Sequence, residues 1–206
     1  MTAPEVLFED VRVVPVIRIE SIDEAIPLAE ALLTGGLRAL EITLRTPVAL
    51  EALSRLAKRF PEALIGAGTV VRADQVAAVV DAGARFAVTP GTTPALLDAL
   101  EAARLPTLPG AATVSEAMAL ADRGFALLKL FPAEAIGGIP LLRSWAAPLP
   151  QLRFCPTGGI QLSNAPRYLE LSNVACIGGS WMVPHDAIAA GRWDEIEKAA
   201  REAADL

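Results

Sequence analysis

Lys129 stands in an unusual setting for a lysine. The chain has three lysines, and Lys58 and Lys198 lie in charged segments of helical period, where a solvated helix face is expected. Lys129 instead lies in the apolar segment FALLKLFPAEA. A lysine is rarely buried unless it is paired or used, and an uncharged lysine amine condenses with a carbonyl compound to form a Schiff base. Covalent carbonyl chemistry is therefore the first hypothesis for this residue.

A second set of polar side chains alternates along the segment ALEITLR at 39–45. Because successive side chains of a strand point to opposite faces, Glu41, Thr43 and Arg45 share one face. A carboxylate can transfer protons during catalysis, and a guanidinium binds a carboxylate well. Two simpler interpretations stay open: a structural ion pair between Glu41 and Arg45, and a Lys129 that only neutralises Glu41.

Two glycine pairs follow apolar segments in the last quarter of the chain, in PTGGI at 156–160 and in IGGS at 177–180. Glycine leaves backbone N–H groups unobstructed, and (β/α)8 barrels frequently bind phosphate at turns in this position. We therefore expect a phosphate site here, formed by Gly158, Gly159, Gly179 and Ser180.

Four other residues have polar or reactive side chains in informative places. Thr69 in GAGTV is expected to donate to a substrate carboxylate beside Arg45, although threonine also caps helices well. Cys155 and Cys176 lie in neighbouring apolar segments, which favours reduced core residues. His185 precedes a helical segment, where a surface or capping role is expected.

These side chains can act together only if strands bring them to one end of the fold. Short aliphatic segments alternate with Ala/Leu/Glu/Arg segments of helical period, a pattern typical of a parallel α/β protein. We predict strands at 13–17, 39–44, 64–68, 86–88, 106–108, 126–130, 152–155 and 174–177. We predict helices at 22–34, from 47 onward, and at 72–82, 94–103, 114–122, 139–146, 164–169 and 186–203. Ser21 with Glu24, and Thr113 with Glu116, predict capping boxes.

Eight strand–helix units with no strand left over predict a compact (β/α)8 TIM barrel, an α/β fold in which residues 1–206 form one domain. The motifs GAGT, TPG, LPGAAT, FPAEA, PTGG and IGGS then follow the strand ends, where barrel active sites lie. An open doubly wound sheet is the alternative. It is disfavoured because no G-x-G-x-x-G motif follows the first strand.

Composition limits the classes of function. The 206 residues are 53% hydrophobic and 20% charged, which argues against disorder, and no apolar run approaches the roughly 18 residues of a membrane span. The net charge of −6 disfavours nonspecific binding to nucleic acid or an anionic membrane. With one histidine and two cysteines without metal-type spacing, we expect no metal and no other cofactor. Reduced cysteines and the absence of a signal-like segment in MTAPEVLFED favour a cytoplasmic protein.

Several motifs together closely resemble the bacterial KDPG/KHG aldolase family: VVPVIR, GGLRALEITLRTP, IGAGTV, FAVTPG, LPGAAT, LLKLFPAE, FCPTGGI and VACIGGSWMVP. The resemblance extends from about Val13 to the C-terminal helix. It implies a class I aldolase, a homotrimer of (β/α)8 barrels without a metal, that acts on 2-keto-3-deoxy-6-phosphogluconate (KDPG).

The resemblance also implies roles for individual residues. The Schiff-base lysine of the family corresponds to Lys129, its general acid/base glutamate to Glu41, and its pyruvate-carboxylate contacts to Arg45 and Thr69. Its phosphate contacts correspond to Gly158, Gly159, Gly179 and Ser180. A threonine that influences substrate stereochemistry corresponds to Thr157, and pocket-wall positions to Pro90 and Phe131. His185 is a peripheral difference, where relatives often carry a basic residue.

The expected reaction is reversible cleavage of KDPG to pyruvate and D-glyceraldehyde 3-phosphate. Within the same class, 4-hydroxy-2-oxoglutarate and the 6-phosphogalactonate epimer are alternative substrates, although Arg45 in EITLR and Thr157 in PTGG resemble the gluconate type more closely. From another class, the chain is alternatively a noncatalytic barrel that binds a phosphorylated metabolite.

Overall fold

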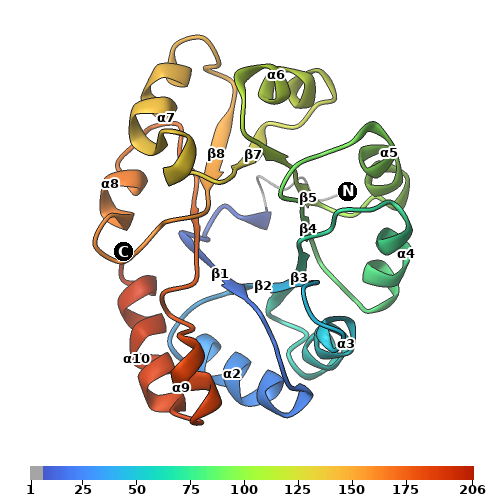
Figure 1. Cartoon of the computed structure of the whole chain (residues 1–206), viewed down its shortest axis with the longest axis vertical. Helices are drawn as coiled ribbons and strands as arrows, with labels where there is room; N and C mark the ends of the chain where they lie inside the picture. Colours follow the sequence, from blue (N-terminus) through green and yellow to red (C-terminus); the bar gives the residue numbers. More distant parts are fainter. Residues whose placement is uncertain (1–6) are drawn as a thin grey trace.

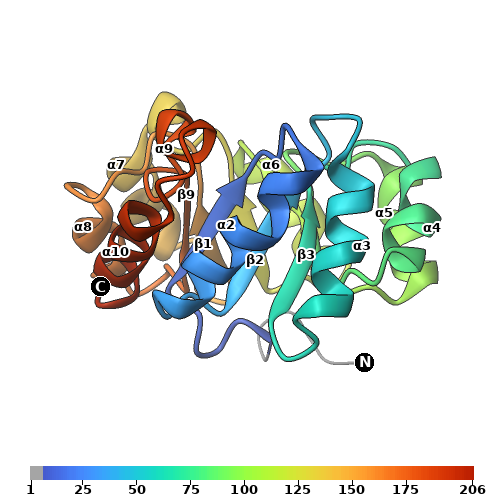
Figure 2. The same ribbon diagram turned by 90° about the horizontal axis from the view of Figure 1, so that it is seen from below.

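The computed structural model describes residues 7–206. Strands occupy the centre of the molecule and helices surround them (Figure 1). Seen from the side, the helices stand against the outer face of the strands, with the first described residues below the strands (Figure 2). Within the described residues, no helix is long and apolar enough to cross a membrane.

The strands pair in parallel. Six of them form one sheet in the order β5 (Thr107–Leu108), β4 (Ala87–Val88), β3 (Leu64–Gly68), β2 (Ala39–Thr43), β1 (Val13–Ile17) and β9 (Ile177–Gly179). A second ladder contains β6 (Gly110–Ala111), β7 (Leu127–Leu130) and β8 (Arg153–Pro156). Isolated bridges join Phe154 to Val174 and Thr157 to Gly178. The strands thus curl into a half-barrel sheet, and their order lacks the reversal of a doubly wound sheet, so that alternative was wrong.

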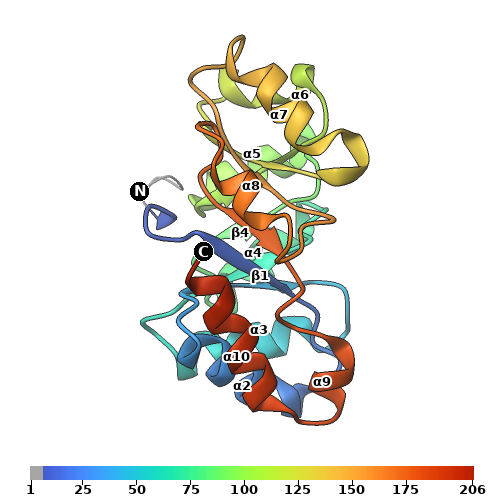
Figure 3. The ribbon, with the colours of Figure 1, turned by 90° about the vertical axis from the view of Figure 1, so that its left-hand side faces the viewer.

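The helices follow the strands in alternation. They are α2 (Ile22–Thr34), α3 (Ala49–Arg59), α4 (Asp74–Asp81), α5 (Pro94–Ala103), α6 (Val114–Asp122), α7 (Gly138–Ala146), α8 (Ala165–Leu169), α9 (His185–Ala189) and α10 (Trp193–Ala204), with a short 3-10 helix η1 (Glu134–Ile136) after β7. The predictions at 22–34, 94–103 and 114–122 are confirmed to the residue. Figure 3 shows α10 alongside α2, so helices from the two ends of the chain pack against each other.

Polar caps explain where two of these helices begin. Thr113 and Glu116 form the predicted capping box of α6: the Thr113 hydroxyl accepts from the Glu116 N–H, and Glu116 accepts from the Thr113 N–H. Ser21 caps α2 by accepting from the Asp23 N–H. The predicted capping box at Ser21 was wrong: the Ser21 hydroxyl does not accept from the Glu24 N–H, and the Glu24 carboxylate accepts from the Glu20 N–H instead of the Ser21 N–H.

Several predicted element bounds were wrong. The second predicted helix begins at Ala49 rather than at Pro47, and the predicted helix at 186–203 is two helices, because α9 ends before Gly191, whose φ is +64°. The strand predicted at 174–177 is observed as β9 at Ile177–Gly179, because its pairing with β1 starts only at Ile177. The bounds at 86–88, 126–130 and 152–155 move by one residue. Neither β6 nor η1 was predicted.

The two faces of the sheet have separate apolar clusters. On β2, Leu40 and Ile42 pack in the outer cluster, under the helices, and on β7 Leu128 and Leu130 do the same. The inner cluster contains Phe8, Val11, Val14, Ala39, Phe86, Val88, Leu108, Leu127, Cys155 and Cys176. The rings of Phe8 and Phe86 meet edge to face, with centroids 5.0 Å apart. Residues 7–12, the described segment before β1, therefore cover the end of the sheet where the strands begin.

Candidate active site

Lys129 on β7 and Glu41 on β2 meet on the inner face of the sheet. Lys129 Nζ donates a hydrogen bond to Glu41 Oε1 over 3.3 Å. Both residues are buried, with exposed fractions of 3% and 2%. Removing two charges from water is costly, so a buried ion pair is weak evidence of a purely stabilising role. The hydrogen bond provides a direct route for a proton between the amine and the carboxylate.

Strand alternation places both residues as the sequence predicts. Glu41 lies two residues after Ala39, and Lys129 two residues after Leu127, and both apolar residues belong to the inner cluster. The pair therefore lies one step further along the strands than the inner cluster, toward the C-terminal ends.

Thr43 shares the face of Glu41 but has a different part in the structure. Its hydroxyl donates to the Ile17 carbonyl over 2.8 Å, and the residue is fully buried. This hydrogen bond ties the end of β2 to the end of β1. Thr43 therefore positions the strand that carries Glu41.

Arg45 and Thr69 lie together just after the ends of β2 and β3. Arg45 Nε donates to Thr69 Oγ1 over 2.9 Å. Arg45 is exposed and makes no ion pair with any residue in the range 7–206, so its charge remains available to an anion. Thr69 has a φ of +58°, a left-handed conformation that β-branched residues rarely adopt and that costs on the order of 1–3 kcal/mol. Such strain is concentrated at functional sites.

A cavity of about 140 Å³ lies beside this pair, at the C-terminal ends of the strands. It is lined by Val16, Arg45, Phe131, Thr157, Gly158, Gly159, Ile160, Gln161, Gly178, Gly179 and Ser180. Arg45 thus faces the same space as both glycine pairs. Lys129 Nζ lies 5.6 Å from the centroid of the Phe131 ring, which places the amine behind one wall of the cavity.

The two glycine pairs differ in conformation. Gly158 and Gly159 form a turn, with φ values of +101° and +81°. The prediction of a second turn in IGGS was wrong, because Gly178 and Gly179 belong to β9 and only Ser180 follows the strand. Side-chain space explains these strand glycines: a Cβ at Gly178 would lie 3.0 Å from Thr157 Cγ2.

Pro90 lies outside the cavity lining but close to the lysine. A Cβ at Gly110 would lie 2.5 Å from the Pro90 carbonyl oxygen, and Gly110 is the register partner of Lys129. The Thr89 hydroxyl accepts from the Gly110 N–H over 3.0 Å. Gly110 therefore lies between Pro90 and Lys129 on the neighbouring strand β7.

The sequence analysis missed four cavity-lining residues: Val16, Ile160, Gln161 and Gly178. Val16 had a signal, because it lies two residues after Val14 on the inner face of β1. Gln161 had none, since a polar residue after a glycine turn is ordinary.

The two cysteines are free and buried. Hydrogen bonding to Cys155, together with burial, raises the pKa of the Cys176 thiol well above its ordinary value, so the thiol stays protonated. His185 is exposed at the start of α9 and does not line the cavity.

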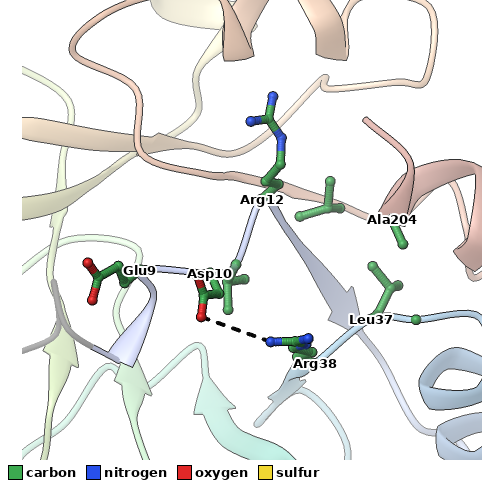
Figure 4. A pocket seen from close by; sticks show the side chains of 9 residues that line it. Glu9, Asp10, Arg12, Leu37, Arg38 and Ala204 are labelled. Atoms are coloured by element: carbon green, nitrogen blue, oxygen red, sulfur yellow. Dashed lines mark ion pairs between the residues drawn. The ribbon is translucent and has the colours of Figure 1, made fainter.

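A second cavity, of about 560 Å³, lies at the opposite end of the strands (Figure 4). Its lining includes Glu9, Asp10, Arg12 and Arg38, and Asp10 and Arg38 form an exposed ion pair at 4.0 Å. These charges of both signs face solvent, and none of the predicted site residues lines this cavity. Although it is the larger space, the C-terminal end combines the buried Lys129–Glu41 pair with an arginine that has no ion-pair partner among residues 7–206, so we assign the candidate site there.

Comparisons with known proteins agree on one family. A family model described as KDPG and KHG aldolase matches residues 5–199. The sequence is 50% identical to the KHG/KDPG aldolase of Escherichia coli K12 over 204 residues, which cover 99% of this chain and 96% of that protein. It is also 50% identical to the 2-dehydro-3-deoxy-phosphogluconate aldolase of Dickeya dadantii over 191 residues, which cover 93% and 90%.

Two solved structures are similar along nearly their whole length. The first is KDPG aldolase from Legionella pneumophila with pyruvate captured at low pH as a covalent carbinolamine intermediate; the TM-score is 0.95 and the identity 50%, with 97% of each chain covered. The second is 2-keto-3-deoxy-6-phosphogluconate aldolase of Zymomonas mobilis with 3-phosphoglycerate; the TM-score is 0.91 and the identity 44%, with 98% of this chain and 94% of that chain covered.

Proposed function

The chain belongs to the KDPG and KHG aldolase family, and we propose that it cleaves KDPG reversibly to pyruvate and D-glyceraldehyde 3-phosphate through a Schiff base on Lys129. It is accordingly a lyase of the class I aldolase type. The observation that carries the proposal is the buried contact of 3.3 Å between Lys129 Nζ and Glu41 Oε1. The pyruvate carbinolamine of the Legionella relative supports the covalent route.

Lys129 supplies the nucleophile. Its uncharged amine adds to the C2 ketone of the substrate to give a carbinolamine, which loses water to give an iminium ion. The iminium withdraws electrons from the neighbouring carbon, so the C3–C4 bond can break. The bonding pair passes into an enamine of pyruvate, and the aldehyde product leaves.

Glu41 moves the protons that these steps require. It accepts the proton of the C4 hydroxyl, directly or through a water, as the C3–C4 bond breaks. The enamine is then protonated at C3, and hydrolysis of the resulting iminium returns the free amine and releases pyruvate. The Glu41 carboxylate already contacts Lys129 Nζ, the atom on which the carbinolamine and the iminium form.

Two groups of residues, at and beside the cavity, are proposed to hold the two anionic ends of the substrate. We assign the pyruvyl carboxylate to Arg45 and Thr69, whose side chains already contact each other. The phosphate is assigned to Gly158, Gly159, Gly179 and Ser180, which line the same cavity as Arg45. Thr157, Phe131 and Pro90 are proposed as pocket residues that select the substrate. The phosphorylated acid bound to the Zymomonas relative supports an anion-binding subsite.

The proposal extends to the whole protein. We propose that residues 1–206 form one domain, a closed (β/α)8 barrel in which β5 and β6 are one strand interrupted at Pro109. Pro109 lacks an N–H, yet its carbonyl accepts from the Lys129 N–H over 2.9 Å. The bridges from β8 to the β9 segment support closure on the other side. A cytoplasmic homotrimer with no metal and no other cofactor completes the proposal.

Borohydride trapping tests the mechanism. Incubation with pyruvate and sodium borohydride is expected to reduce the iminium to a stable secondary amine on Lys129, identified by peptide mass spectrometry. Lys129→Ala is expected to abolish both adduct and cleavage, whereas Lys58→Ala, which removes an exposed lysine, leaves both intact. The mechanism is wrong if no adduct forms, if it maps to Lys58 or Lys198, or if Lys129→Ala keeps near-normal turnover.

Two further measurements address the alternatives. Retro-aldol rates on KDPG, its galactonate epimer and 4-hydroxy-2-oxoglutarate rank the substrates within the class. Calorimetry distinguishes the aldolase from a noncatalytic barrel that binds a phosphorylated metabolite. In a noncatalytic barrel, the Lys129→Ala variant would bind the substrate with undiminished affinity, and even the wild type would show no turnover.

A further inference from the structure

The turn at Gly158 and Gly159 is attached to the segment that follows the lysine strand. The Ala133 N–H donates to the Thr157 carbonyl over 2.8 Å, and the Glu134 N–H donates to the Gly158 carbonyl over 3.1 Å. These carbonyls are therefore occupied, which holds the turn in one orientation. Gly158 and Gly159 both line the cavity described above.

Tyr168 on α8 holds the Glu134 side chain in place. Its hydroxyl donates a short hydrogen bond to Glu134 Oε1, and the residue is fully buried. Burial, with the Glu134 carboxylate as a second cause, raises the pKa of the Tyr168 phenol far above its ordinary value. The phenol therefore stays protonated and remains a donor.

The chain leaves space for this pair at two glycines. Gly159 has a φ of +81°, and a Cβ there would lie 2.6 Å from Glu134 Cβ. Gly138 begins α7 with a φ of +51°, and a Cβ there would lie 2.9 Å from Glu134 Oε1 and closer still to the Tyr168 hydroxyl. Glu134 thus packs directly on the turn, and its carboxylate is held by a buried donor.

Asn164 holds the other side of the turn. Its Nδ2 donates to the Gly159 carbonyl over 3.1 Å, and its Oδ1 accepts from the Gln161 N–H over 2.8 Å. One amide therefore fixes the last residue of the glycine pair relative to the chain that leaves it.

None of Glu134, Tyr168 and Asn164 is among the residues lining the cavity. We propose that these three residues, the turn clasp, are positioning residues that preset the Gly158–Gly159 turn for the phosphate of the substrate and so determine the preference for phosphorylated over unphosphorylated 2-keto acids. The inference rests on the proposed function, because that function assigns the phosphate to this turn.

Loss of the clasp is expected to affect one half of the substrate only. In the wild type the N–H groups of the turn are already oriented before the phosphate binds. If the turn is loosened, the phosphate must order these groups itself, and this entropic cost weakens its binding. Formation of the imine on Lys129 needs only the pyruvyl half and is expected to be unchanged. The predicted signature is a higher KM for KDPG with a nearly constant kcat.

Tyr168→Phe, which removes one hydroxyl and keeps the ring, is the first test. We expect the KM for KDPG and the inhibition constant of inorganic phosphate against KDPG each to rise about tenfold, on the order of the loss of one hydrogen bond to a charged group. The kcat and the pyruvate concentration that gives half-maximal borohydride trapping are expected to stay within about twofold of the wild type.

Three further variants test the clasp separately from fold stability. Asn164→Ala and Glu134→Ala are expected to show the same split as Tyr168→Phe. Glu134→Gln keeps an oxygen acceptor for the phenol and is expected to restore most of the phosphate affinity. Thr107→Val is the control: it removes a hydroxyl that donates to the Leu105 carbonyl over 2.8 Å at the start of β5, and both KM and phosphate inhibition should stay unchanged.

The outcomes are distinct. The clasp is overturned if Tyr168→Phe and Asn164→Ala leave phosphate inhibition unchanged, or if they reduce pyruvate trapping as much as phosphate binding. Failure of the proposed function appears in the wild type instead, as an absence of KDPG cleavage or of an adduct on Lys129. If Tyr168→Phe does not fold, Asn164→Ala and the two Glu134 variants decide the matter by the same criteria.

Discussion

Gly68 on β3 makes room for the Glu41 carboxylate. A Cβ at Gly68 would lie 2.5 Å from Glu41 Cγ and closer to Oε1, whereas no atom lies within 4 Å of a Cβ placed at Gly91. The missing side chain at Gly68 therefore lets Glu41 reach Lys129. A glycine in a strand is commonly found where another group approaches closely.

We predict that Gly68→Ala displaces Glu41 and lowers kcat by about 100-fold, the low end of the range for a general acid/base. Deuterium exchange at C3 of pyruvate, followed by NMR, should slow in parallel, while binding of pyruvate through Arg45 persists. Gly91→Ala is the matched control, with wild-type exchange expected. Near-normal exchange in Gly68→Ala would show that Glu41 can move at little cost.

At the scale of single residues, the sequence predicted the contacts that follow from the alternation of side chains along a strand. Strand alternation was sufficient for Glu41 and Lys129, because a period of two assigns each side chain to a face. It was not sufficient for Tyr168 and Glu134. Their contact depends on how α8 packs against η1, and no pattern within either segment reports that packing.

At the scale of the element, the start of α6 depends on an ionised carboxylate. Hydrogen bonds, above all from the Ala112 N–H and then from the Thr113 N–H and hydroxyl, hold the pKa of Glu116 below its ordinary value of 4.5. Because the pKa is lower in the folded state, this contribution to stability is fully present above the unfolded-state value. It is lost as the pH falls through the folded-state value.

We predict that Glu116→Ala lowers the free energy of unfolding by about 0.5–1 kcal/mol at pH 7, a range already reduced by solvent screening. The difference from wild type should shrink as the pH falls below about 4.5 and through the lower folded-state pKa of Glu116. Urea unfolding at pH 7 and in an acid titration below that value measures it. Glu170→Ala is the comparison, since Glu170 is exposed and has no ion pair among residues 7–206, and a pH dependence equal to that of Glu116→Ala would contradict the assignment.

Elements with strong local signals were predicted best. The α2, α5 and α6 helices have capping residues at Ser21, Thr93 and Thr113, and the bounds of all three were correct. The end of β9 was not predictable in this way. Gly178 and Gly179 disfavour a strand by propensity, and only the space required by Thr157 and Trp181 from outside the segment explains them.

At the scale of the whole molecule, the segment before β1 closes one end while the candidate site occupies the other. Phe8 is 2% exposed and packs in the inner cluster against Phe86. Removing a buried phenylalanine side chain typically costs about 3–5 kcal/mol. The Lys129–Glu41 pair lies further along the strands, toward the opposite end.

We therefore predict that Phe8→Ala lowers the free energy of unfolding by about 3 kcal/mol and leaves the kcat of the folded enzyme within about twofold. Denaturant unfolding and steady-state kinetics below the transition measure the two quantities. Val80→Ala, at a side chain that is 40% exposed, should cost far less. A stability loss in Phe8→Ala no larger than in Val80→Ala would show that the segment does not close the end of the sheet.

The pairing of β1 with β9 has a consequence for how the protein comes to be folded. Val13 pairs with Ile177, and Gly35 at the end of α2 packs so closely on α10 that a Cβ there would lie 2.5 Å from Ala200 Cβ. A nascent chain emerging from the ribosome therefore exposes one edge of β1 until nearly the whole sequence has been synthesised. Contacts of such long sequence separation form slowly, and an unpaired strand edge invites association with other chains. A stalled or truncated translation product that lacks residues 177–179 would keep this edge unpaired and would be a substrate for chaperones.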